Sequence, residues 1–348
     1  MMNENILLHE VQPGDTLEKI GKTIGMTSDQ LKDFHNSHCN RMDKLWFDNL
    51  VGVRQIFVPK AYKSPEELII EKKKELPPPD VTKDFYADNY SVKETFSNSL
   101  GNDLVIEYKI NINFKINRET NLPYLIADVR CYDFTKNTAT PNDKMSLISL
   151  ACMESIYPIS FMVYVQGKIS GIFEFEKLRQ RFEKRRPDLE DFFIGEIYKT
   201  YLDKFHASLE NQEFILKQFS SALLYQLLFP KTEWFYKTNN WTEDFHFVQN
   251  SFHLKCIMSA EYNHENTETV ETLLKGSIKD PFCLQEIIRG ISFNEESDEP
   301  ANSQVELWYL TDKKTKKMLE AEASVSLWND NELYRKQTLK LTQDEEIS

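Results

Sequence analysis

The sequence predicts an α+β chain with a small βααβ module at its N-terminus, followed by a large antiparallel sheet that a helical block interrupts. The first supporting observation is that residues 6–59 hold two strand-like segments around two short amphipathic helices. The second is a charged stretch at 61–80 that contains three consecutive prolines. The third is that long segments with every second residue apolar recur on both sides of the helical block, as in half-buried strands. We therefore expect domains at 1–60 and 81–348, joined by a linker at 61–80.

The N-terminal module carries a start or stop signal for each of its elements. A Pro-Gly turn, "QPGD", ends the first strand, and Asp15 or Thr16 can cap the first helix, because a short side-chain oxygen accepts from free N–H groups one turn on. Gly25 is placed to end that helix, and Thr27 with Gln30 has the pattern of a capping box that opens the second. A second strand, "VRQIFVP", stops at a proline. The two strands are expected to pair antiparallel.

The module resembles the LysM domain. The segments that carry the resemblance are "VQPGDTLEKIGKTIGMTSDQLKDFHN" and "VGVRQIFVP", within about residues 8–59. LysM domains typically bind N-acetylglucosamine-containing glycans such as peptidoglycan or chitin, in a shallow groove between the loop that opens the first helix and the loop after the second. Carried over to this sequence, the resemblance implies glycan contacts at Gly14, Asp15, Thr16, Leu17 and Asn36.

The loop after the second helix departs from the family pattern. The usual short link is replaced by "SHCNRMDKLWFDNLVG", in which Trp46 and Phe47 stand side by side. Three roles stay open for these aromatic residues. They can pad the core together with Leu50 or dock the module within the chain, they can anchor a protein partner, or they can extend the sugar platform by stacking.

The same region holds three side chains of the types that bind zinc. His35, His38 and Cys39 form the run "HNSHC", and imidazole and thiolate are zinc ligands. No fourth ligand is near in the sequence, and no CxxC accompanies the run. We expect ordinary polar loop residues, with no metal and no cofactor.

The linker and the first strands of the large domain follow. Residues 65–75 can form one short helix, and residues 77–79 favour an extended polyproline spacer. Strands are expected within 104–135. The first spans 104–116, where every even-numbered residue is apolar, and the second returns at 124–134 after the turn "RETNLP".

Helices within 143–229 separate these strands from later ones within 234–342. Asp143 is placed to cap the first helix, and Gln166-Gly167 to turn a hairpin. Further helices are expected at 175–186, 188–209 (with an apolar stripe that begins at Ile194) and 212–229. The later strands are expected at 244–249, 252–262, 267–278, 304–311, 317–328 and 334–342, with the acidic loop "NEESDEPANSQ" exposed. A curved sheet or half-barrel would accommodate this order.

Composition excludes several classes of function. The chain has 348 residues, 10 glycines and a net charge of −13. The acidic balance argues against a nucleic-acid or membrane-surface binder, whose affinity comes from basic patches, and no glycine-rich phosphate loop is present. The start "MMNENILLHEV" lacks the basic and apolar regions of a signal peptide, and no apolar run is long enough to span a membrane. We therefore expect a cytoplasmic protein with five buried, reduced cysteines, or one exported by a leaderless route.

No catalytic motif stands out. Neither HExxH nor GxSxG occurs, and among 55 acidic residues some pair always has the spacing of a muramidase acid and base, so spacing carries no weight. We expect no enzyme. The favoured function is an adaptor, structural or loading component of a bacterial contractile injection machine, because the chain resembles LysM-containing proteins near type VI secretion loci. Its partners would be proteins of that assembly. The alternative is a glycan-binding protein or leaderless cell-wall effector with peptidoglycan as its ligand.

Overall fold

The computed structural model describes residues 6–63, 65–80, 82–98, 101, 103–115, 124–292, 300–329 and 332–344. The chain divides into two compact units, 1–74 and 75–348. The expected turn "RETNLP" and most of the expected acidic loop lie outside the described residues. Among the described residues, no helix is both long enough and apolar enough to cross a membrane.

The first unit has the expected βααβ order. Its elements are β1 Ile6–Glu10, α1 Leu17–Ile24, α2 Ser28–His38, a 3-10 turn at Arg41–Asp43 and β2 Gln55–Pro59, followed by α3 Pro65–Glu75. The strands pair antiparallel. One small core joins helices, loop and strand: Leu17, Ile20, Met26, Leu31, Leu45, Leu50, Ile56 and Val58.

The capping signals of the first unit act as the sequence indicates. Thr16, rather than Asp15, caps α1, and its hydroxyl accepts from the Lys19 N–H at 3.1 Å. Gly25 ends this helix in the left-handed conformation, with φ +76°. Thr27 and Gln30 form the expected reciprocal capping box at α2. Local hydrogen bonding therefore defines both helices.

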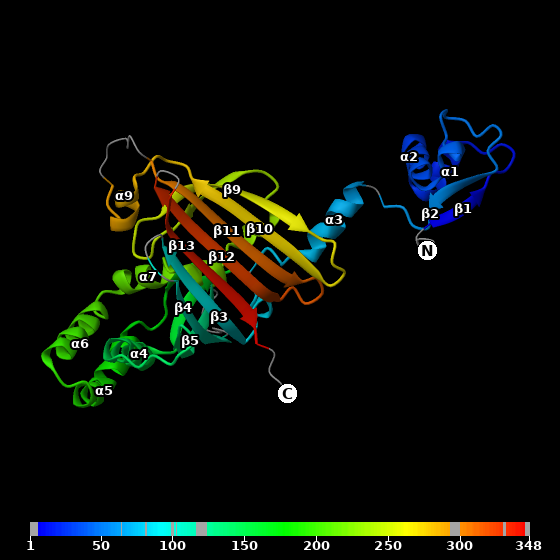
Figure 1. Cartoon of the computed structure of the whole chain (residues 1–348). Coiled ribbons are helices and arrows are strands. Elements are labelled where there is room, and N and C mark those ends of the chain that lie inside the picture. The colour runs from blue at the N-terminus through cyan, green and yellow to red at the C-terminus, as the bar shows by residue number, and fades with distance from the viewer. Residues whose placement is uncertain are drawn as a thin grey trace. The chain divides into compact units, whose positions relative to one another are not determined.

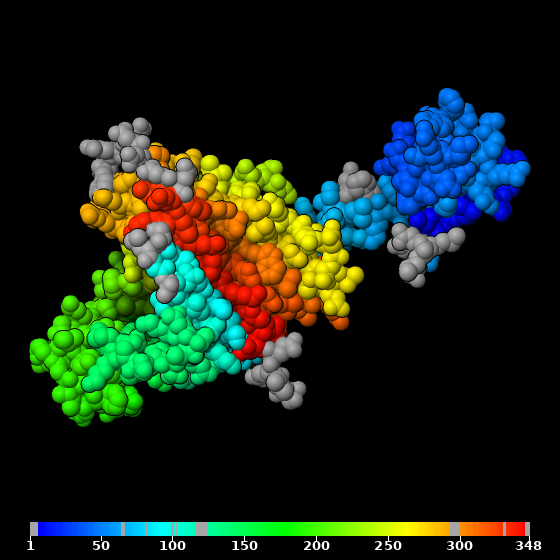
Figure 2. Space-filling model, in the orientation of Figure 1, coloured from blue at the N-terminus to red at the C-terminus, as the bar shows by residue number. Residues whose placement is uncertain are grey.

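The large unit is built on one antiparallel sheet. Its elements are β3 Asn89–Asn98, β4 Leu104–Lys115, β5 Tyr124–Lys136, α4 Lys144–Ile156, β6 Ile159–Tyr164, β7 Ile169–Ile172, α5 Glu176–Phe192, α6 Glu196–Ser208, α7 Gln212–Ser220, α8 Leu223–Leu228, β8 Trp241–Phe245, β9 Leu254–Asn263, β10 Thr269–Ile278, α9 Leu284–Arg289, β11 Asn302–Asp312, β12 Met318–Asn329 and β13 Glu332–Gln343. The eleven strands follow the order β7-β6-β5-β4-β3-β13-β12-β11-β10-β9-β8. Figure 1 shows α4, α5 and α6 together beside β4 and β5. In Figure 2, the cyan surface of β3 lies beside the red surface of β13, so the first and last strands of the unit are neighbours.

The sheet curls strongly. Strands spaced about 4.8 Å apart would place the two edges of a flat eleven-stranded sheet roughly 48 Å from each other. Yet Lys168, directly before edge strand β7, has its Nζ atom 3.0 Å from Glu243 Oε1 on the opposite edge strand β8. The sheet therefore forms the curved half-barrel that the strand order suggests.

Helix α8 and the segment that joins it to β8 pack inside the curled sheet. The Tyr309 hydroxyl of β11 donates to the Leu227 carbonyl of α8 at 3.2 Å. Tyr225 packs on Phe161 of β6, with 5.1 Å between ring centroids, and Phe235 meets Tyr309 edge-on at 5.2 Å. Residues from opposite sides of the sheet thus share one aromatic core.

Two helix boundaries near Pro187 differ from the expectation. Helix α5 continues through Pro187, and Phe182 and Leu189 on either side of the proline are both buried. Core packing on both sides outweighs the loss of one backbone hydrogen bond. The break comes at Gly195, whose φ of +134° favours glycine. Ile194 therefore precedes α6 and is 81% exposed, so the expected stripe does not begin there.

Other elements were displaced or missed. The expected helix at 212–229 divides into α7 and α8 at Ser221, whose hydroxyl accepts from the Asn250 N–H at 2.9 Å. The strand expected at 244–249 occupies the earlier residues of β8. Strand β3 and the six-residue helix α9 were not predicted.

The proline run is attached to the large unit. Leu76 and Pro77 are buried, and the carbonyls of Pro77 and Pro79 accept hydrogen bonds from the hydroxyls of Tyr236 and Thr232 respectively. The expected helix at 65–75 is α3. Residues 76–79 therefore serve as a packed strap and not as a free spacer.

Candidate functional site

Two loops of the first unit leave the same end of its strand pair. Glu10, the last residue of β1, pairs with Gln55, the first residue of β2. The next residue pair continues this register, since the Val11 N–H donates to the Arg54 carbonyl at 2.9 Å. The turn at 12–16 and the long loop at 39–54 therefore start from neighbouring positions, as a binding groove between them requires.

The turn at 12–16 is stabilised by its own polar atoms. The Asp15 carboxylate accepts from the Gln12 N–H at 2.9 Å and contacts His9 Nε2 at 3.2 Å. The Gln12 hydrogen bond, and then His9, hold the pKa of this exposed carboxyl below its ordinary value. Gly14 has a φ of +93°, and Leu17 is buried in the core. In this segment, the backbone around Gly14 and part of the Asp15 side chain are therefore available to contact a ligand.

Asn36 positions the long loop. Its side-chain Nδ2 donates to the Leu45 carbonyl at 2.9 Å, and its Oδ1 accepts from the Leu45 N–H at 2.7 Å. This pair of bonds places Leu45 in the core. The side-chain amide is thus engaged inside the protein.

His35 is a second support of this loop and not the polar loop residue expected. It lies in α2 and is buried, its Nδ1 accepts from the Phe57 N–H at 3.0 Å, and its Nε2 therefore donates to the Asp43 carbonyl at 2.9 Å. Both ring nitrogens are engaged, so His35 is unsuited to metal binding. His38 contacts the Phe34 carbonyl at 2.7 Å. In the described part of the chain, no group of three or more His, Cys, Asp or Glu side chains is placed to hold a metal ion.

The loop at 39–54 exposes four large apolar side chains. Trp46 and Phe47 are each 74% exposed, and Met42 and Val51 are still more open. Padding of the small core is therefore not the role of the two aromatic residues. Leu45 and Leu50, which flank them, fill that role. We call Met42, Trp46, Phe47 and Val51 the loop patch.

We predict that Asn36→Ala loosens this loop. Both polar groups of Leu45 would lose their partners in a partly buried position, which should cost about 1–3 kcal/mol in the free energy of unfolding of the module. Hydrogen exchange at the Leu45 amide should become faster. Ser37→Ala, which removes exposed hydrogen bonds to the Phe34 carbonyl and to His38 on the same helix, is the control and should leave that exchange rate unchanged. Equal protection of Leu45 in wild type and Asn36→Ala would contradict the assignment.

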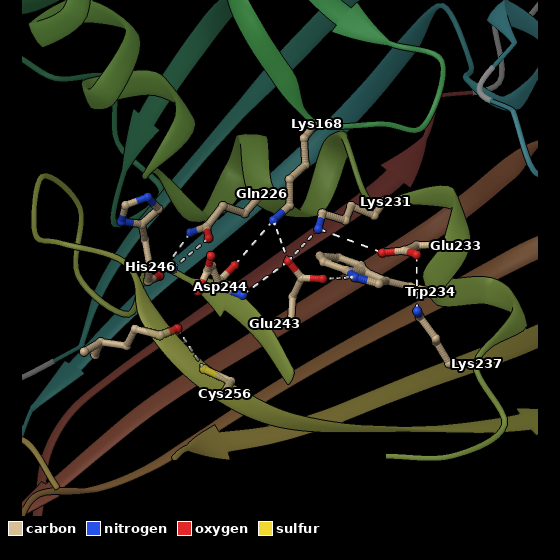
Figure 3. Close-up of polar contacts among 11 residues, drawn as sticks. Lys168, Gln226, Lys231, Glu233, Trp234, Lys237, Glu243, Asp244, His246 and Cys256 are labelled. Atoms are coloured by element: carbon tan, nitrogen blue, oxygen red, sulfur yellow. Dashed lines mark hydrogen bonds and ion pairs between the residues drawn. The ribbon is translucent and has the colours of Figure 1, made fainter. Parts of the chain in front are cut away.

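The large unit holds a buried polar cluster at the closure of the sheet (Figure 3). Glu243 is buried, and its carboxylate lies 3.0 Å from Lys168 Nζ and 2.9 Å from Lys231 Nζ. The indole N–H of Trp234 donates to its other oxygen at 2.9 Å. Burial alone would raise the pKa of this carboxyl, but the Lys168 charge and the hydrogen bonds outweigh burial and hold the pKa below its ordinary value. Sequence reasoning missed this cluster, because its members lie on three separate segments.

Other titratable groups of the large unit are shifted away from reactivity at neutral pH. Burial raises the pKa of Cys131 to about 11 and those of Cys152 and Cys256 to about 12. Protonated thiols are poor nucleophiles. Burial, and then the neighbouring His253, lower the pKa of His246 to about 4, so its ring is neutral at pH 7. The Nδ1 atom of His246 has no hydrogen-bond partner among the described residues.

Comparison with known proteins assigns a family to the first unit alone. A search of curated proteins gives no match for this chain. A solved structure described as lipid–protein interactions in lipovitellin matches at 9% identity with a TM-score of 0.37, over 74% of this chain. The chain spans only 24% of the length of that lipovitellin chain, and so low a score does not establish a shared fold. The LysM domain family model matches residues 9–34. The N-terminal module is therefore a LysM domain, a family that suggests binding of peptidoglycan or another N-acetylglucosamine glycan.

Proposed function

We propose that this chain is a non-enzymatic adaptor or structural component of a cytoplasmically assembled bacterial contractile injection machine, and that its LysM domain docks onto a protein of that assembly. The observation that carries the docking proposal is the loop patch. Exposed aromatic side chains anchor protein interfaces, and the patch sits in the loop where this sequence is longer than the family pattern. The contractile machine is proposed from the sequence resemblance.

The loop patch offers enough surface for a specific contact. A Trp or Phe ring buries about 150–250 Å² in an interface. At about 25 cal/mol per Å², two rings contribute several kcal/mol before the costs of ordering and association are subtracted. This gain suffices for a hot spot at the centre of a protein interface.

A glycan-binding function is the second candidate, and the LysM match supports it. Asp15, Thr16 and Asn36 already use side-chain polar atoms inside the module. A sugar would therefore be held by the turn backbone near Gly14 and by stacking on an aromatic ring of the loop patch. Peptidoglycan is the natural ligand to test.

We predict that Trp46→Ala weakens the protein complex at least tenfold and accelerates its dissociation, because a buried aromatic anchor contributes more than about 1.4 kcal/mol. Full-length protein is immobilised, a host lysate is passed over it, and bound proteins are identified by mass spectrometry. Leu7→Ala, which removes a half-exposed apolar side chain from β1 of the same module, is the control. The expected result is a stoichiometric machine component, retained by Leu7→Ala and lost by Trp46→Ala.

The same variants separate the two candidates. Chitopentaose is titrated into full-length protein, and sedimentation with purified sacculi is measured in parallel. The docking proposal expects no difference between wild type and Trp46→Ala in either assay. If wild type binds both glycans, Trp46→Ala binds neither and no machine component is captured, the glycan function replaces the adaptor.

We also predict no hydrolysis of peptidoglycan. A muramidase needs an acid and a base on opposite sides of the scissile bond, and no motif in this sequence places such a pair. Purified protein is incubated with sacculi, and soluble muropeptides are measured by chromatography beside a lysozyme control. Release of muropeptides above the buffer background would show that this prediction is wrong.

A further inference from the structure

The large unit contains a cavity of about 710 Å³ between the sheet and its helices. Strands β3, β4 and β5 form one wall, and helices α4, α6, α7 and α8 form the other. Ligand pockets in proteins typically measure about 300–1,000 Å³. The cavity therefore has room for a ligand of ordinary small-molecule size, and neither the LysM domain nor the Glu243 cluster takes part in it.

The walls of this cavity are mainly apolar. Ile106 faces Met153 and Ile215 across the space, and Phe219 and Leu224 contribute to the same lining. Methionine and aromatic side chains adapt to flexible apolar ligands. Such a wall favours a ligand with a hydrocarbon body.

The cavity is open to solvent, and small side chains line parts of its helical wall. Met145 and Phe214, which are 44% and 45% exposed, both belong to the lining. Ser149 of α4 also lines the space and is half-buried. A ligand could thus enter without unfolding the unit, and a larger side chain at Ser149 would occupy the space.

Among the described residues that line the cavity, Glu94 carries the one carboxyl group. It lies on β3, cross-strand from Ile106, and its Oε1 accepts from Gln337 Nε2 at 2.6 Å. Burial raises the pKa of Glu94, while the Gln337 hydrogen bond and the more distant Arg335 charge oppose that shift. A carboxyl group that is removed from water is stabilised by a hydrogen-bond donor on the ligand, and it repels a negatively charged ligand.

The lining also includes polar groups that carry no charge, among them the Thr135 hydroxyl, which has no hydrogen-bond partner among the described residues. Three others are the hydroxyls of Tyr157 and Tyr225 and the Cys131 thiol. Burial raises the pKa values of all three groups, so they are uncharged at neutral pH. In the part of the lining that the structure describes, the only basic residue is Lys136, which is exposed. Glu94 is therefore the group that would select the polar end of a ligand.

We propose that this cavity binds an amphiphile with a single hydrocarbon chain and a polar end that donates a hydrogen bond, and that Glu94 accepts that hydrogen bond. Alcohols and amines share this chemistry. A fatty acid of equal chain length does not, because its carboxylate would face the Glu94 carboxylate. The large unit then has a ligand of its own, in addition to any ligand of the LysM domain.

The test uses full-length protein at pH 8 with the fluorescent apolar probe N-phenyl-1-naphthylamine. Decanol, decylamine and decanoate displace the probe in separate titrations, so that only the polar end differs. We expect decanol and decylamine to displace it at concentrations at least about tenfold lower than decanoate, because the carboxylate meets a like charge. Equal displacement by all three compounds overturns the proposal.

Two substitutions locate the site. Ser149→Phe fills space that at least two methylenes of the chain would occupy, so we expect roughly tenfold weaker probe binding. Lys144→Phe adds the same ring at an exposed position of α4 outside the lining and should bind the probe like wild type. If neither substitution weakens probe binding, or if both weaken it equally, the probe binds elsewhere and the proposal fails.

Glu94→Gln tests the selecting group and does not depend on whether Ser149→Phe folds. The preference for decylamine over decanoate should fall by about tenfold, since a charge-assisted hydrogen bond is replaced by a neutral one. Probe binding itself should persist, because the hydrocarbon wall is unchanged. An unchanged preference would overturn the role of Glu94 and with it the proposal.

Discussion

Glu243→Gln is expected to lower the free energy of unfolding of the large unit by about 2–4 kcal/mol. Removing a buried charge leaves its partners uncompensated, which typically costs about 3–5 kcal/mol. The lower figure applies here because Lys168 and Lys231 are about one-third exposed and water hydrates them in part. Urea unfolding followed by the fluorescence of Trp234, which contacts Glu243, measures the change.

Glu233→Gln is the matched control, since Glu233 also contacts Lys231 but is 52% exposed. It should change the free energy of unfolding by less than about 0.5 kcal/mol. A carboxyl with a lowered folded pKa stabilises the protein above its unfolded pKa, and this contribution disappears as the pH falls through the folded pKa. The difference between wild type and Glu243→Gln should therefore be full at pH 7 and shrink below the ordinary carboxyl pKa of 4.5. A difference that stays constant from pH 7 to pH 3 would argue against the charge as its cause.

Gly167→Ala is expected to destabilise the large unit by more than about 3 kcal/mol, at the high end of single substitutions. Gly167 has a φ of +86°, and a Cβ atom there would lie 1.8 Å from the Pro230 carbonyl oxygen. Hydrogen bonds fix the backbone around Gly167 against the backbone around Pro230. The Lys168 N–H donates to the Phe229 carbonyl, and the Thr232 N–H donates to the Gln166 carbonyl. Neither segment can move without breaking these bonds. Thermal unfolding by circular dichroism measures the effect, together with the yield of folded protein.

Two controls separate the clash from other causes. Gln166→Ala changes an exposed side chain of the same turn and keeps its carbonyl, so it should alter the melting temperature little. Gly52→Ala has a φ of +81° with no heavy atom within 4 Å of the added Cβ, so it should cost the LysM domain about 1 kcal/mol of backbone strain alone. If Gly167→Ala cost no more than Gly52→Ala, the close approach to Pro230 would be unimportant.

The sequence predicted best those features that local chemistry decides. The Thr16 cap, the Thr27–Gln30 capping box and the Asp143 cap of α4 all follow from side chains within a few residues of the backbone groups they serve. Strand β4 was also predicted, because its apolar residues alternate and one of its faces is buried, and β5 was predicted as its return strand. Such signals need no knowledge of the rest of the chain.

The missed elements depend on distant partners. Strand β3 turns Tyr90 and Val92 into the core, but its next residue of that face is Glu94, which breaks the apolar alternation. Its neighbour β13 begins more than 200 residues later. Helix α5 passes through Pro187 because tertiary packing on both sides outweighs local preference. No local pattern could predict either outcome.

The candidate sites show the same difference between features that local sequence decides and features that depend on distant parts of the chain. The sequence indicated the LysM turn and the aromatic loop, yet three roles were open for Trp46 and Phe47 until their exposure excluded core padding. Asn36 was carried over as a glycan contact, and the structure shows its amide bound to Leu45. The 710 Å³ cavity could not be predicted at all, because it arises between strands and helices that are far apart in sequence.

The pairing of β3 with β13 has a consequence for how the protein is made on the ribosome. Strands β3 to β7 can pair as they emerge, and β8 to β12 can pair among themselves, because each group joins strands that follow one another along the chain. In the strand order the two groups are joined by β13, the last strand of the unit along the sequence. Until β13 has been synthesised, each half-sheet has an open edge at which it can pair with another chain. Long-range pairing of this kind also slows folding, so the nascent large unit is a natural client for chaperones.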